Sequence, residues 1–387
     1  MRKRVVLDSM LLSSEVSILI LASFSSSLLN FRGPLIESLV ARGYQVHVAA
    51  PELSIDRKTT SWLRGYGVTW HDIPLSRAGL NPSVDFCTLL SLIGLMRRVR
   101  PSVFLGYTIK PVIWGMLAAT ISRVPRRFSL ITGLGYAFTG VARGKRRVVQ
   151  RLVCWLYRIA LSGAHKVFFQ NPDDASLFRD LGLLDWRKPV VLIHGSGVDL
   201  DWYSPHILPD EPVFLMIARL VADKGIREYV EAARLVKQEF PQTRFQLAGG
   251  FDPNPMGIKP DEVEAWIEEG VIEYLGELDD VRPALAATRF YVLPSYREGT
   301  PRTVLEAMAT GRPVITTDAP GCRETVIDGE NGFLVPVQNV EALRKAMVAL
   351  LKQPELAERM AQRGLEIVRD KYDVHKVNAA IMEAMGL

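Results

Sequence analysis

The chain has 387 residues, which is too long for one compact core, so its length favours two domains. Hydrophobic residues make up 48% of the chain and charged residues 23%, the proportions of an ordinary globular protein, and the formal net charge is +5. The three cysteines are widely spaced and the six histidines are scattered. This argues against a disulfide framework and a zinc-type cluster, and it indicates a reducing compartment.

Residues 1–15 are interpreted as a loose leader. The opening Met-Arg-Lys-Arg is similar to the start of a signal peptide, but Asp8 and Glu15 interrupt any apolar core behind it. The uncharged run 16–31 is too short, and too rich in serine and asparagine after Leu21, to cross a membrane, which needs about 20 apolar residues. We therefore expect neither a signal peptide nor a membrane span.

The first half of the chain alternates between short apolar runs and segments of helical spacing. A polar turn, 25–27, separates the first predicted strand from the first predicted helix. Strands are predicted at 16–23, 45–50, 68–73, 102–107, 128–132, 166–170 and 190–193, and helices at 31–43, 85–99, 144–162 and after Lys110-Pro111. This order predicts a parallel sheet with right-handed crossovers.

The charge of this half is strongly asymmetric, because no Asp or Glu occurs from Phe86 to Pro172. Such a surplus of cations indicates a polyanionic partner, which is a membrane surface, a diphosphate or a nucleic acid. The fourteen cations of the segment are Arg97, Arg98, Arg100, Lys110, Arg123, Arg126, Arg127, Arg143, Lys145, Arg146, Arg147, Arg151, Arg158 and Lys166.

The predicted helix 144–162 combines basic and aromatic residues. Its first turns carry Lys145, Arg146, Arg147 and Arg151, and Trp155 follows within an apolar stretch. This composition suits a helix that lies on anionic lipid. The alternative is a core helix whose arginines are merely exposed.

The alternation restarts after a proline-rich stretch. Three prolines in residues 201–212 mark that stretch as a linker between a domain at 16–200 and a second domain at 213–370, with a helix in 371–387 that returns to the first domain. Strands are predicted at 213–217, 244–248, 271–275, 290–293, 313–317 and within 325–336, and helices at 225–240, 261–270, 281–288, 303–310, 340–353 and 354–370. We therefore expect two doubly wound α/β domains that face a cleft.

Residues 289–318 read as a strand, a glycine-containing turn, a helix closed by Gly311, and a second strand. Such a turn presents backbone N–H groups at the positive end of a helix, which favours an anion. Glu298 lies on the turn and Glu306 about two helical turns beyond it, and carboxylates there accept hydrogen bonds from hydroxyls. Phosphate and hydroxyl recognition together describe a sugar nucleotide. The alternative is a capped helix with a solvated Glu298 and a Glu306 favoured by the helix dipole.

Three stretches of the second half then resemble one family. They are Arg219-Leu-Val-Ala-Asp-Lys-Gly225, Glu298-Gly-Thr-Pro-Arg-Thr-Val-Leu-Glu306-Ala-Met-Ala-Thr-Gly311 and Asn331-Gly-Phe-Leu-Val335. In this order they resemble the family 4 retaining glycosyltransferases. The resemblance implies the GT-B architecture of two Rossmann-like domains.

The resemblance also implies roles for individual residues. Glu298 would lie near the donor sugar hydroxyls and Glu306 at the nucleotide ribose, while Arg219 and Lys224 would hold the donor diphosphate. The backbone of Gly299, Thr300, Pro301 and Arg302 would complete that site. The alternative for the two cations is an exposed basic turn.

No metal or other cofactor is expected besides the nucleotide sugar, because fixed cations and helix amides can stabilise the leaving diphosphate. Asp199-Leu-Asp201 has the form of a metal-binding motif but lies at the linker, and we interpret it as chance. In retaining enzymes of this kind the attack comes from the same face as the leaving group, and no protein nucleophile is assigned.

The first half resembles a subgroup that extends lipid-linked glycans. The stretches concerned are Asn30-Phe-Arg32, Tyr107-Thr-Ile-Lys-Pro111, Ile131-Thr-Gly-Leu-Gly-Tyr136 and Gly195-Ser-Gly-Val-Asp199. Many family members carry a histidine where this chain has the turn 107–110, so we do not expect a histidine-dependent step. Lys110 is a candidate contact for a phosphate or the acceptor, as are Asn30, Arg32 and Tyr136. The alternative for Lys110 is simple solvation at a strand end.

We therefore expect a transferase of a hexose or N-acetylhexosamine, which passes from a UDP-sugar, with retention, to a polyprenyl-diphosphate-linked saccharide. The pathway would build surface polysaccharide, such as O-antigen or capsule, or a glycoprotein glycan. The protein would be cytoplasmic, peripherally bound to the anionic inner face of the cell membrane, and without a nucleic-acid partner. One alternative is a sugar-nucleotide 2-epimerase on the same architecture. Another is a non-catalytic scaffold that binds membrane or nucleic acid, which would leave the paired glutamates without a purpose.

Overall fold

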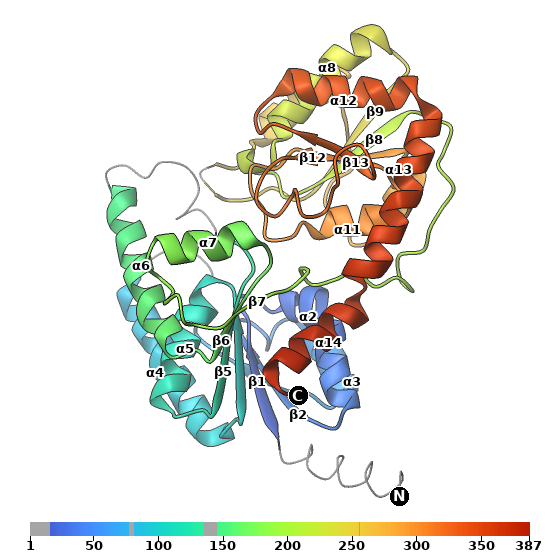
Figure 1. Cartoon of the computed structure of the whole chain (residues 1–387). Coiled ribbons are helices and arrows are strands. Elements are labelled where there is room, and N and C mark those ends of the chain that lie inside the picture. Colours follow the sequence, from blue (N-terminus) through green and yellow to red (C-terminus); the bar gives the residue numbers. More distant parts are fainter. Residues whose placement is uncertain (1–15, 77–80, 135–144, 255) are drawn as a thin grey trace, which may run out of the picture. The chain divides into compact units, whose positions relative to one another are not determined.

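A computed structural model describes residues 16–76, 81–134, 145–254 and 256–387. The chain forms two compact units, shown in Figure 1. Unit 1 comprises the residues up to Ser196 together with the C-terminal segment Asn378–Leu387, and unit 2 comprises Gly197–Val377. Each unit is an α/β layer structure around a parallel sheet, and each is described by itself.

The sheet of unit 1 has seven strands in the order β3-β2-β1-β4-β5-β6-β7, and every neighbouring pair is parallel. The innermost strands carry uncharged side chains and are completely buried, because helices cover both faces of a parallel sheet. The strands are β1 (Ser17–Leu21), β2 (Gln45–Ala50), β3 (Thr69–Asp72), β4 (Val103–Tyr107), β5 (Arg126–Ile131), β6 (Lys166–Phe169) and β7 (Val190–Leu192).

The helices of unit 1 lie on both sides of this sheet. Figure 1 shows α2 (Ser26–Ala41) and α3 (Arg57–Gly65) on one side, and α4 (Pro82–Val99), α5 (Met116–Ile121) and α6 (Lys145–Ser162) on the other. A π-helical turn, Pro111–Gly115, precedes α5, and α7 (Pro172–Asp180) follows β6. This arrangement is the expected result of right-handed crossovers that run outward in both directions from β1 and β4.

One expectation for this unit was wrong in detail, and two helices were missed. The stretch 25–27 is not a polar turn ahead of a helix at 31, because α2 already begins at Ser26 and the Ser27 hydroxyl donates to the Phe24 carbonyl at 2.6 Å. Helices α3 and α7 were not predicted, although both begin with a strong cap. The Asn171 side chain accepts the backbone N–H of Asp174 at 2.8 Å and Pro172 follows it, which is the usual start of a helix.

The last helix, α14 (Val374–Met385), runs from unit 2 into unit 1. Its final carbonyls accept hydrogen bonds from cations of the unit 1 sheet: the Lys166 ammonium contacts the Ala384 carbonyl at 2.7 Å, and the Arg126 guanidinium contacts the Gly386 carbonyl at 3.0 Å. Positive groups suit the negative end of a helix. These contacts hold the C-terminal segment against unit 1.

Unit 2 has a six-stranded parallel sheet in the order β10-β9-β8-β11-β12-β13. Its centre is aromatic, because Phe214 stacks on Phe245 and Phe290 with ring centroids 5.2 Å and 4.6 Å apart. The strands are β8 (Val213–Ile217), β9 (Arg244–Ala248), β10 (Glu273–Tyr274), β11 (Phe290–Leu293), β12 (Val314–Thr317) and β13 (Gly332–Val335). The helices are α8 (Ile226–Glu239), α9 (Pro260–Glu268), α10 (Arg282–Ala287), α11 (Arg302–Ala309), α12 (Val340–Lys352) and α13 (Pro354–Ile367).

The strand order decides where a ligand can bind. In unit 1 the order reverses between β1 and β4, and in unit 2 it reverses between β8 and β11. At such a point the loops that leave the two strands diverge and open a crevice at the carboxyl edge of the sheet. The prediction of two doubly wound Rossmann-like units is confirmed. None of the described helices combines the length and the apolar character that a membrane crossing requires.

Candidate active site

Most of the predicted donor residues of unit 2 lie on the two loops that leave β8 and β11, at the reversal of strand order, while Arg302 and Glu306 lie on α11. Gly225 joins these loops. Its φ is +74°, and a Cβ at this position would lie 2.1 Å from the Pro294 carbonyl oxygen, so no other residue fits without moving the backbone. The loops are also hydrogen-bonded, because the Asp223 carbonyl accepts the Tyr296 N–H at 2.8 Å. This packing fixes the position of Lys224 beside the start of the second loop.

Lys224 and Glu298, both predicted from the sequence, are in direct contact. The Lys224 ammonium lies 2.5 Å from Glu298 Oε1, and the exposed fractions of the two side chains are only 14% and 17%. The Ser295 hydroxyl donates to the same oxygen at 2.8 Å. A shielded cation is therefore held next to the turn that precedes α11, with a carboxylate and a hydroxyl as its neighbours.

The turn 298–301 is supported from a third loop, which follows β12. The Glu298 N–H donates to the Pro320 carbonyl at 2.9 Å. Gly321 packs against the same peptide, since a Cβ there would lie 2.2 Å from the Glu298 carbonyl oxygen. The N-cap residue of α11 is Pro301, which supplies no side-chain acceptor, and the first turn of α11 contains no acidic residue. The positive N-terminal end of α11 therefore faces the turn, and no carboxylate in the first turn of α11 offsets its charge.

Glu306 is buried within α11, with an exposed fraction of 5%. Its Oε1 accepts the Tyr203 hydroxyl at 2.9 Å and lies 2.8 Å from Arg302 Nε. Burial raises the pKa of Glu306, although the positive Arg302 and the Tyr203 hydrogen bond act in the opposite direction. Glu306 is therefore a buried residue of α11 and not a solvated one.

Tyr203 was missed by the sequence analysis, which placed it in a linker. Asp199 provides the signal that could have found it. Its carboxylate accepts the backbone N–H groups of Asp201 and Trp202 at 2.9 Å and 3.0 Å, and its carbonyl accepts that of Tyr203 at 2.9 Å. The Asp199-Leu-Asp201 stretch is therefore a turn that directs Tyr203 into the core of unit 2.

Arg219 contacts a residue that was not predicted. Its guanidinium lies 2.5 Å from an Asp252 carboxylate oxygen on the loop after β9, and 57% of the Arg219 side chain is exposed. The β8 and β9 loops approach closely here, because the Leu220 N–H donates to the Gly250 carbonyl at 3.0 Å. Arg219 therefore keeps exposed N–H groups while one of them is held by Asp252.

The acceptor candidates of unit 1 lie in two different environments. Arg32 is 2% exposed and lies over the Tyr107 ring at 5.3 Å, whereas Asn30 is exposed on α2. The Tyr107 hydroxyl is 2.8 Å from the Ser27 hydroxyl, and burial raises the pKa of Tyr107 to about 12. Tyr136 lies outside the described residues.

Lys110 is not a solvated strand end, so that alternative was wrong. Its ammonium forms an ion pair with Asp85 at 2.8 Å, and the exposed fractions of the two side chains are 11% and 7%. Asp85 stands one residue before the acid-free segment, so the sequence count did not include it. Together with the contacts of Arg126 and Lys166 to the C-terminal carbonyls, this pair uses part of the positive charge of unit 1 internally.

Helix α6 has both a core face and an exposed apolar stripe. Val153, Tyr157 and Leu161 are buried against the unit. The stripe consists of Val148, Leu152, Trp155 and Ile159, whose exposed fractions are 67%, 45%, 58% and 39%. Arg147 and Arg151 are exposed on the same helix, while the side chains of Lys145 and Arg146 lie outside the described ones. Besides its core face and its exposed arginines, α6 therefore presents exposed apolar side chains.

No group of three or more metal-ligating side chains occurs within the described ranges. The arrangement in unit 2 instead offers a shielded ammonium, an uncapped helix start and two carboxylates. Cations and helix amides bind phosphates, and carboxylates accept hydrogen bonds from sugar hydroxyls.

Two protein-family descriptions match the sequence, and together they extend over both units. Residues 17–171 match Glycosyl transferase 4-like, and residues 211–353 match Glycosyl transferases group 1. The chain belongs to the family 4 glycosyltransferases. The second match includes every predicted donor residue described above, from Arg219 to Glu306.

Relatives of this glycosyltransferase extend over most of its length. It is 29% identical, over 89% of its own chain and 92% of the relative, to N,N'-diacetylbacillosaminyl-diphospho-undecaprenol alpha-1,3-N-acetylgalactosaminyltransferase of Campylobacter jejuni. It is 25% identical, over 68% of its chain and 70% of the relative, to UDP-Gal:alpha-D-GlcNAc-diphosphoundecaprenol alpha-1,3-galactosyltransferase of Escherichia coli.

The structure is similar to that of sucrose-phosphate synthase from Thermosynechococcus elongatus. The TM-score is 0.79 at 20% sequence identity, and the match covers 96% of this chain and 98% of the synthase. At this identity the match shows the fold alone, and the GT-B fold expected from the sequence is confirmed.

Proposed function

We propose that this glycosyltransferase moves a hexose or N-acetylhexosamine, with retention, from a UDP-sugar to a saccharide linked to polyprenyl diphosphate. The observation that carries the proposal is its likeness, over most of its length, to two bacterial transferases whose names specify diphospho-undecaprenol acceptors. One of these names also specifies a UDP-linked donor. The product would enter surface polysaccharide or a glycoprotein glycan.

Unit 2 would bind the donor at the start of α11. The Lys224 ammonium and the first-turn amides of α11 supply positive charge where the diphosphate leaves with additional negative charge. In this proposal a phosphate oxygen becomes a further partner of Lys224, and Glu298 is then available to the sugar hydroxyls. Arg219, held by Asp252 and largely exposed, would contribute a second cation.

Glu306 would accept the ribose hydroxyls. Its burial and its contacts with Tyr203 and Arg302 keep the carboxylate in one orientation, which a hydroxyl-binding residue requires. Because its charge is disfavoured by burial, ligand hydroxyls that donate to it would stabilise the charged form. No step in this proposal uses a metal ion.

Unit 1 would meet the membrane through α6. The exposed stripe of Val148, Leu152, Trp155 and Ile159 can enter the interface of a bilayer, while Arg147 and Arg151 contact anionic headgroups. The acceptor carries both a lipid and a diphosphate, so a helix of this composition would bring the enzyme to the surface where its acceptor resides. We therefore propose peripheral association with the inner face of the cell membrane.

The test is acceptor-dependent release of UDP. The purified chain is incubated with UDP-glucose, UDP-galactose and their N-acetylated counterparts, with and without a short-chain polyprenyl-diphosphate-linked N-acetylhexosamine. Released UDP and the mass of the lipid product are measured. We expect release only with acceptor, together with a product heavier by one sugar residue. A nucleotide sugar that isomerises at its C2 position without acceptor would instead support the epimerase alternative.

A further inference from the structure

We propose that a pocket at the amino edge of the unit 1 sheet, where the strands begin, binds a phosphate ester of glycerol or of a sugar. This site goes beyond the proposed function and does not depend on it. The pocket measures about 450 Å³, within the roughly 300–1,000 Å³ of small-molecule sites. It lies between the ends of α6 and α7 and the segment that leads into β7.

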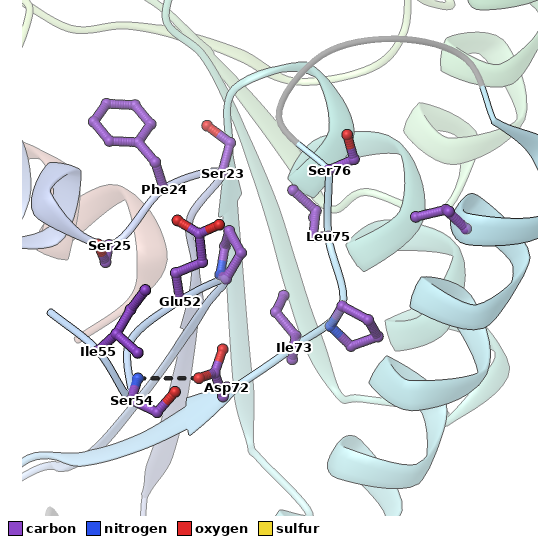
Figure 2. A pocket seen from close by; sticks show the side chains of 13 residues that line it. Ser23, Phe24, Ser25, Glu52, Ser54, Ile55, Asp72, Ile73, Leu75 and Ser76 are labelled. Carbon is purple, nitrogen blue, oxygen red and sulfur yellow. Dashed lines mark hydrogen bonds between the residues drawn. The ribbon is translucent and has the colours of Figure 1, made fainter.

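This pocket is separate from the carboxyl edge of the same sheet. In a parallel sheet each crossover helix ends close to the start of the next strand, so α6 and α7 end near the starts of β6 and β7. A larger cavity, of about 870 Å³, opens at the carboxyl edge, where β1, β2 and β3 end (Figure 2). Substitutions in the amino-edge pocket therefore leave the carboxyl edge of the sheet unchanged.

The pocket is rich in positive charge. Arg158 of α6, Arg179 of α7 and Lys188 before β7 line it, and Asp185 brings a carboxylate. The neighbouring His165 reports the same charge, because burial and the nearby cations, Lys188 among them, lower its pKa. Cations that converge on a hollow favour an anionic ligand.

The end of α6 does not require Arg158. Cations near the C-terminus of a helix ordinarily bind its last carbonyls. In α6 the carbonyls of residues 159–162 accept hydrogen bonds at 2.7–3.1 Å from other donors, which are the Ser162 hydroxyl, the Gly163 and Ala164 N–H groups and the Lys188 ammonium. Lys188 thus closes the helix, and Arg158 takes no part.

The end of α7 likewise does not require Arg179. The carbonyls of residues 177–179 accept backbone N–H groups at 2.9–3.0 Å, from Leu181, Leu183 and Gly182. Within the described ranges, neither the Arg158 nor the Arg179 side chain forms an ion pair or a hydrogen bond. Both guanidinium groups therefore have N–H donors available to a ligand.

Gly182 allows the two arginines to share one pocket. Its φ is +63°, and a Cβ there would lie 3.4 Å from a terminal nitrogen of Arg158, so the guanidinium of α6 lies against the turn that ends α7. A guanidinium group presents a planar fork that matches two phosphate oxygens. Arginines from two helices at one pocket are therefore suited to a phosphate group.

The remaining lining suits the organic part of an ester. Trp186 is 75% exposed and supplies an apolar ring, over which Arg187 lies at 4.9 Å. One oxygen of Asp185 accepts the Arg187 N–H at 2.8 Å, which leaves the other for a ligand hydroxyl. Glycerol and sugar phosphates combine a phosphate, hydroxyls and C–H groups, and this combination matches the pocket.

Two sources can supply such an ester. Arg158 is next to Ile159 of the exposed apolar stripe of α6, so a bilayer that meets the stripe would bring lipid headgroups close to the pocket. A soluble glycerol or sugar phosphate presents the same chemistry. Soluble and vesicle-bound probes separate the two sources.

The first experiment follows sn-glycerol 3-phosphate by saturation-transfer NMR with the full chain, in the presence of excess UDP to occupy a donor site. We expect signals from glycerol 3-phosphate and none from glycerol. Arg158→Gln and Arg179→Gln should each weaken binding about tenfold, because a charged donor is replaced by a neutral amide. Arg57→Gln/Arg64→Gln, which removes two exposed arginines from α3, should leave binding unaltered.

Asp185→Asn should have the opposite effect. The amide oxygen of asparagine can still accept the Arg187 N–H, so the turn is kept while the negative charge is removed. We expect the affinity for glycerol 3-phosphate to rise about threefold, with an unchanged melting temperature. A purely structural role of these residues would not produce a gain in binding.

Vesicles that contain phosphatidylglycerol identify the source. For a lipid headgroup, Arg158→Gln/Arg179→Gln should lower vesicle binding about tenfold below that of Arg57→Gln/Arg64→Gln. Vesicle binding equal to that of this control, together with loss of glycerol 3-phosphate binding, would support the site and assign it to a soluble ester. Glycerol 3-phosphate signals that survive Arg158→Gln/Arg179→Gln would overturn the proposal. The absence of any signal, with vesicle binding equal to that of the control, would overturn it as well.

Discussion

In the proposed function, Lys224 is the residue on which donor chemistry would depend most directly. Gly225 fixes its backbone against Pro294, and Glu298 and Ser295 surround its side chain, so the ammonium is in place before a ligand arrives. Preorganised positive charge of this kind avoids reorganisation during the reaction and is a main source of rate enhancement. The ion pair with Glu298 positions the Lys224 side chain more than it stabilises the fold, because shielded ion pairs add little net stability.

We expect Lys224→Met to lower kcat about a hundredfold, as the loss of one preorganised donor does in other enzymes. The melting temperature should also fall, because the shielded Glu298 carboxylate loses the cation that compensates its charge. Lys345→Met, on the exposed side of α12, is the matched control. A Lys224→Met enzyme with a turnover within threefold of the unaltered chain would show that this cation does not contact the leaving diphosphate.

Glu306 should reduce stability at neutral pH while it supports binding. Its pKa is raised in the folded chain, so the protonated form is favoured there, and the folded state loses stability as pH rises through the folded-state pKa. The difference in free energy of unfolding between Glu306→Gln and the unaltered chain should therefore increase, in favour of the variant, from pH 4 to pH 8.

Donor affinity should fall in the same Glu306→Gln variant, because the ribose hydroxyls lose a charged acceptor. Chemical denaturation at several pH values and titration with UDP measure the two effects. A Glu306→Gln variant that is less stable than the unaltered chain at pH 8 would show that Tyr203 and Arg302 offset the cost of burying the Glu306 charge. This account of Glu306 would then be wrong.

The sequence was informative about these residues for a physical reason. Gly225, next to Lys224, is required by its close approach to the Pro294 carbonyl, so it leaves a pattern that can be read directly. The partners Ser295 and Asp252 leave none, because any loop of suitable length could present a hydroxyl or carboxylate there. Only the three-dimensional arrangement of three loops identifies them.

At the scale of elements, the neighbouring strands β2 and β3 carry a pair of histidines. His47 Nδ1 lies 3.1 Å from His71 Nε2, and the rings stack with centroids 5.4 Å apart. Burial lowers the pKa of both rings, and His47 and Arg98 help to lower that of His71 to about 4. Both rings are thus neutral at pH 7, and two protonated rings could not stay in contact.

This pair should make unit 1 sensitive to acid. A folded-state pKa below the unfolded value gives stability that is present above about pH 6.5 and is lost as pH falls towards 4. After allowance for solvent screening, we expect His71→Asn to remove roughly 1–2 kcal/mol of the loss between pH 7 and pH 4.5. Thermal unfolding at both pH values tests this, with the exposed His375→Asn as control. Equal losses of stability between pH 7 and pH 4.5 in the His71→Asn variant and the unaltered chain would contradict this prediction.

Helix α6 gives the second prediction at this scale. Arg147→Ala/Arg151→Ala should weaken binding to vesicles that contain phosphatidylglycerol by about 2 kcal/mol, or roughly thirtyfold, since each basic residue near an anionic surface contributes about 1 kcal/mol. Adding Trp155→Ala should weaken it further, and 0.5 M salt should reduce the arginine contribution. Vesicle sedimentation provides the measurement.

The matched control for α6 is Arg57→Ala/Arg64→Ala, which removes two exposed arginines from α3 in the same unit. Equal losses in the two double variants would mean that net charge, and not this helix, determines membrane binding. Loss of binding in the α6 variants alone would assign the contact to the stripe and its arginines.

Most elements were predictable, and the exceptions have identifiable causes. The buried strands of both sheets are uncharged runs between polar turns, a pattern that tertiary packing reinforces. The short helices α3 and α7 were missed because nine residues hold too few periods of helical spacing to stand out from a loop. Their caps, Asp56 and Asn171, were the stronger signals.

At the scale of the whole molecule, the count of charged residues was a less direct guide to binding surfaces than the fold was. The acid-free segment suggested fourteen cations facing a partner, yet Lys110 is paired with Asp85 and two others hold the C-terminal carbonyls. A count along the chain cannot separate internal use of charge from display at a surface. The strand order, in contrast, places the loops that carry the proposed donor residues at the carboxyl edge of the unit 2 sheet.

The central claim is that the donor diphosphate lies against the start of α11 beside Lys224. A crystal structure of the chain with UDP tests this most directly. We expect a phosphate oxygen within hydrogen-bond distance of the Lys224 ammonium and of the first amides of α11, with ribose hydroxyls on Glu306. A diphosphate bound away from both Lys224 and the α11 start, with the Lys224–Glu298 contact unchanged, would contradict the claim.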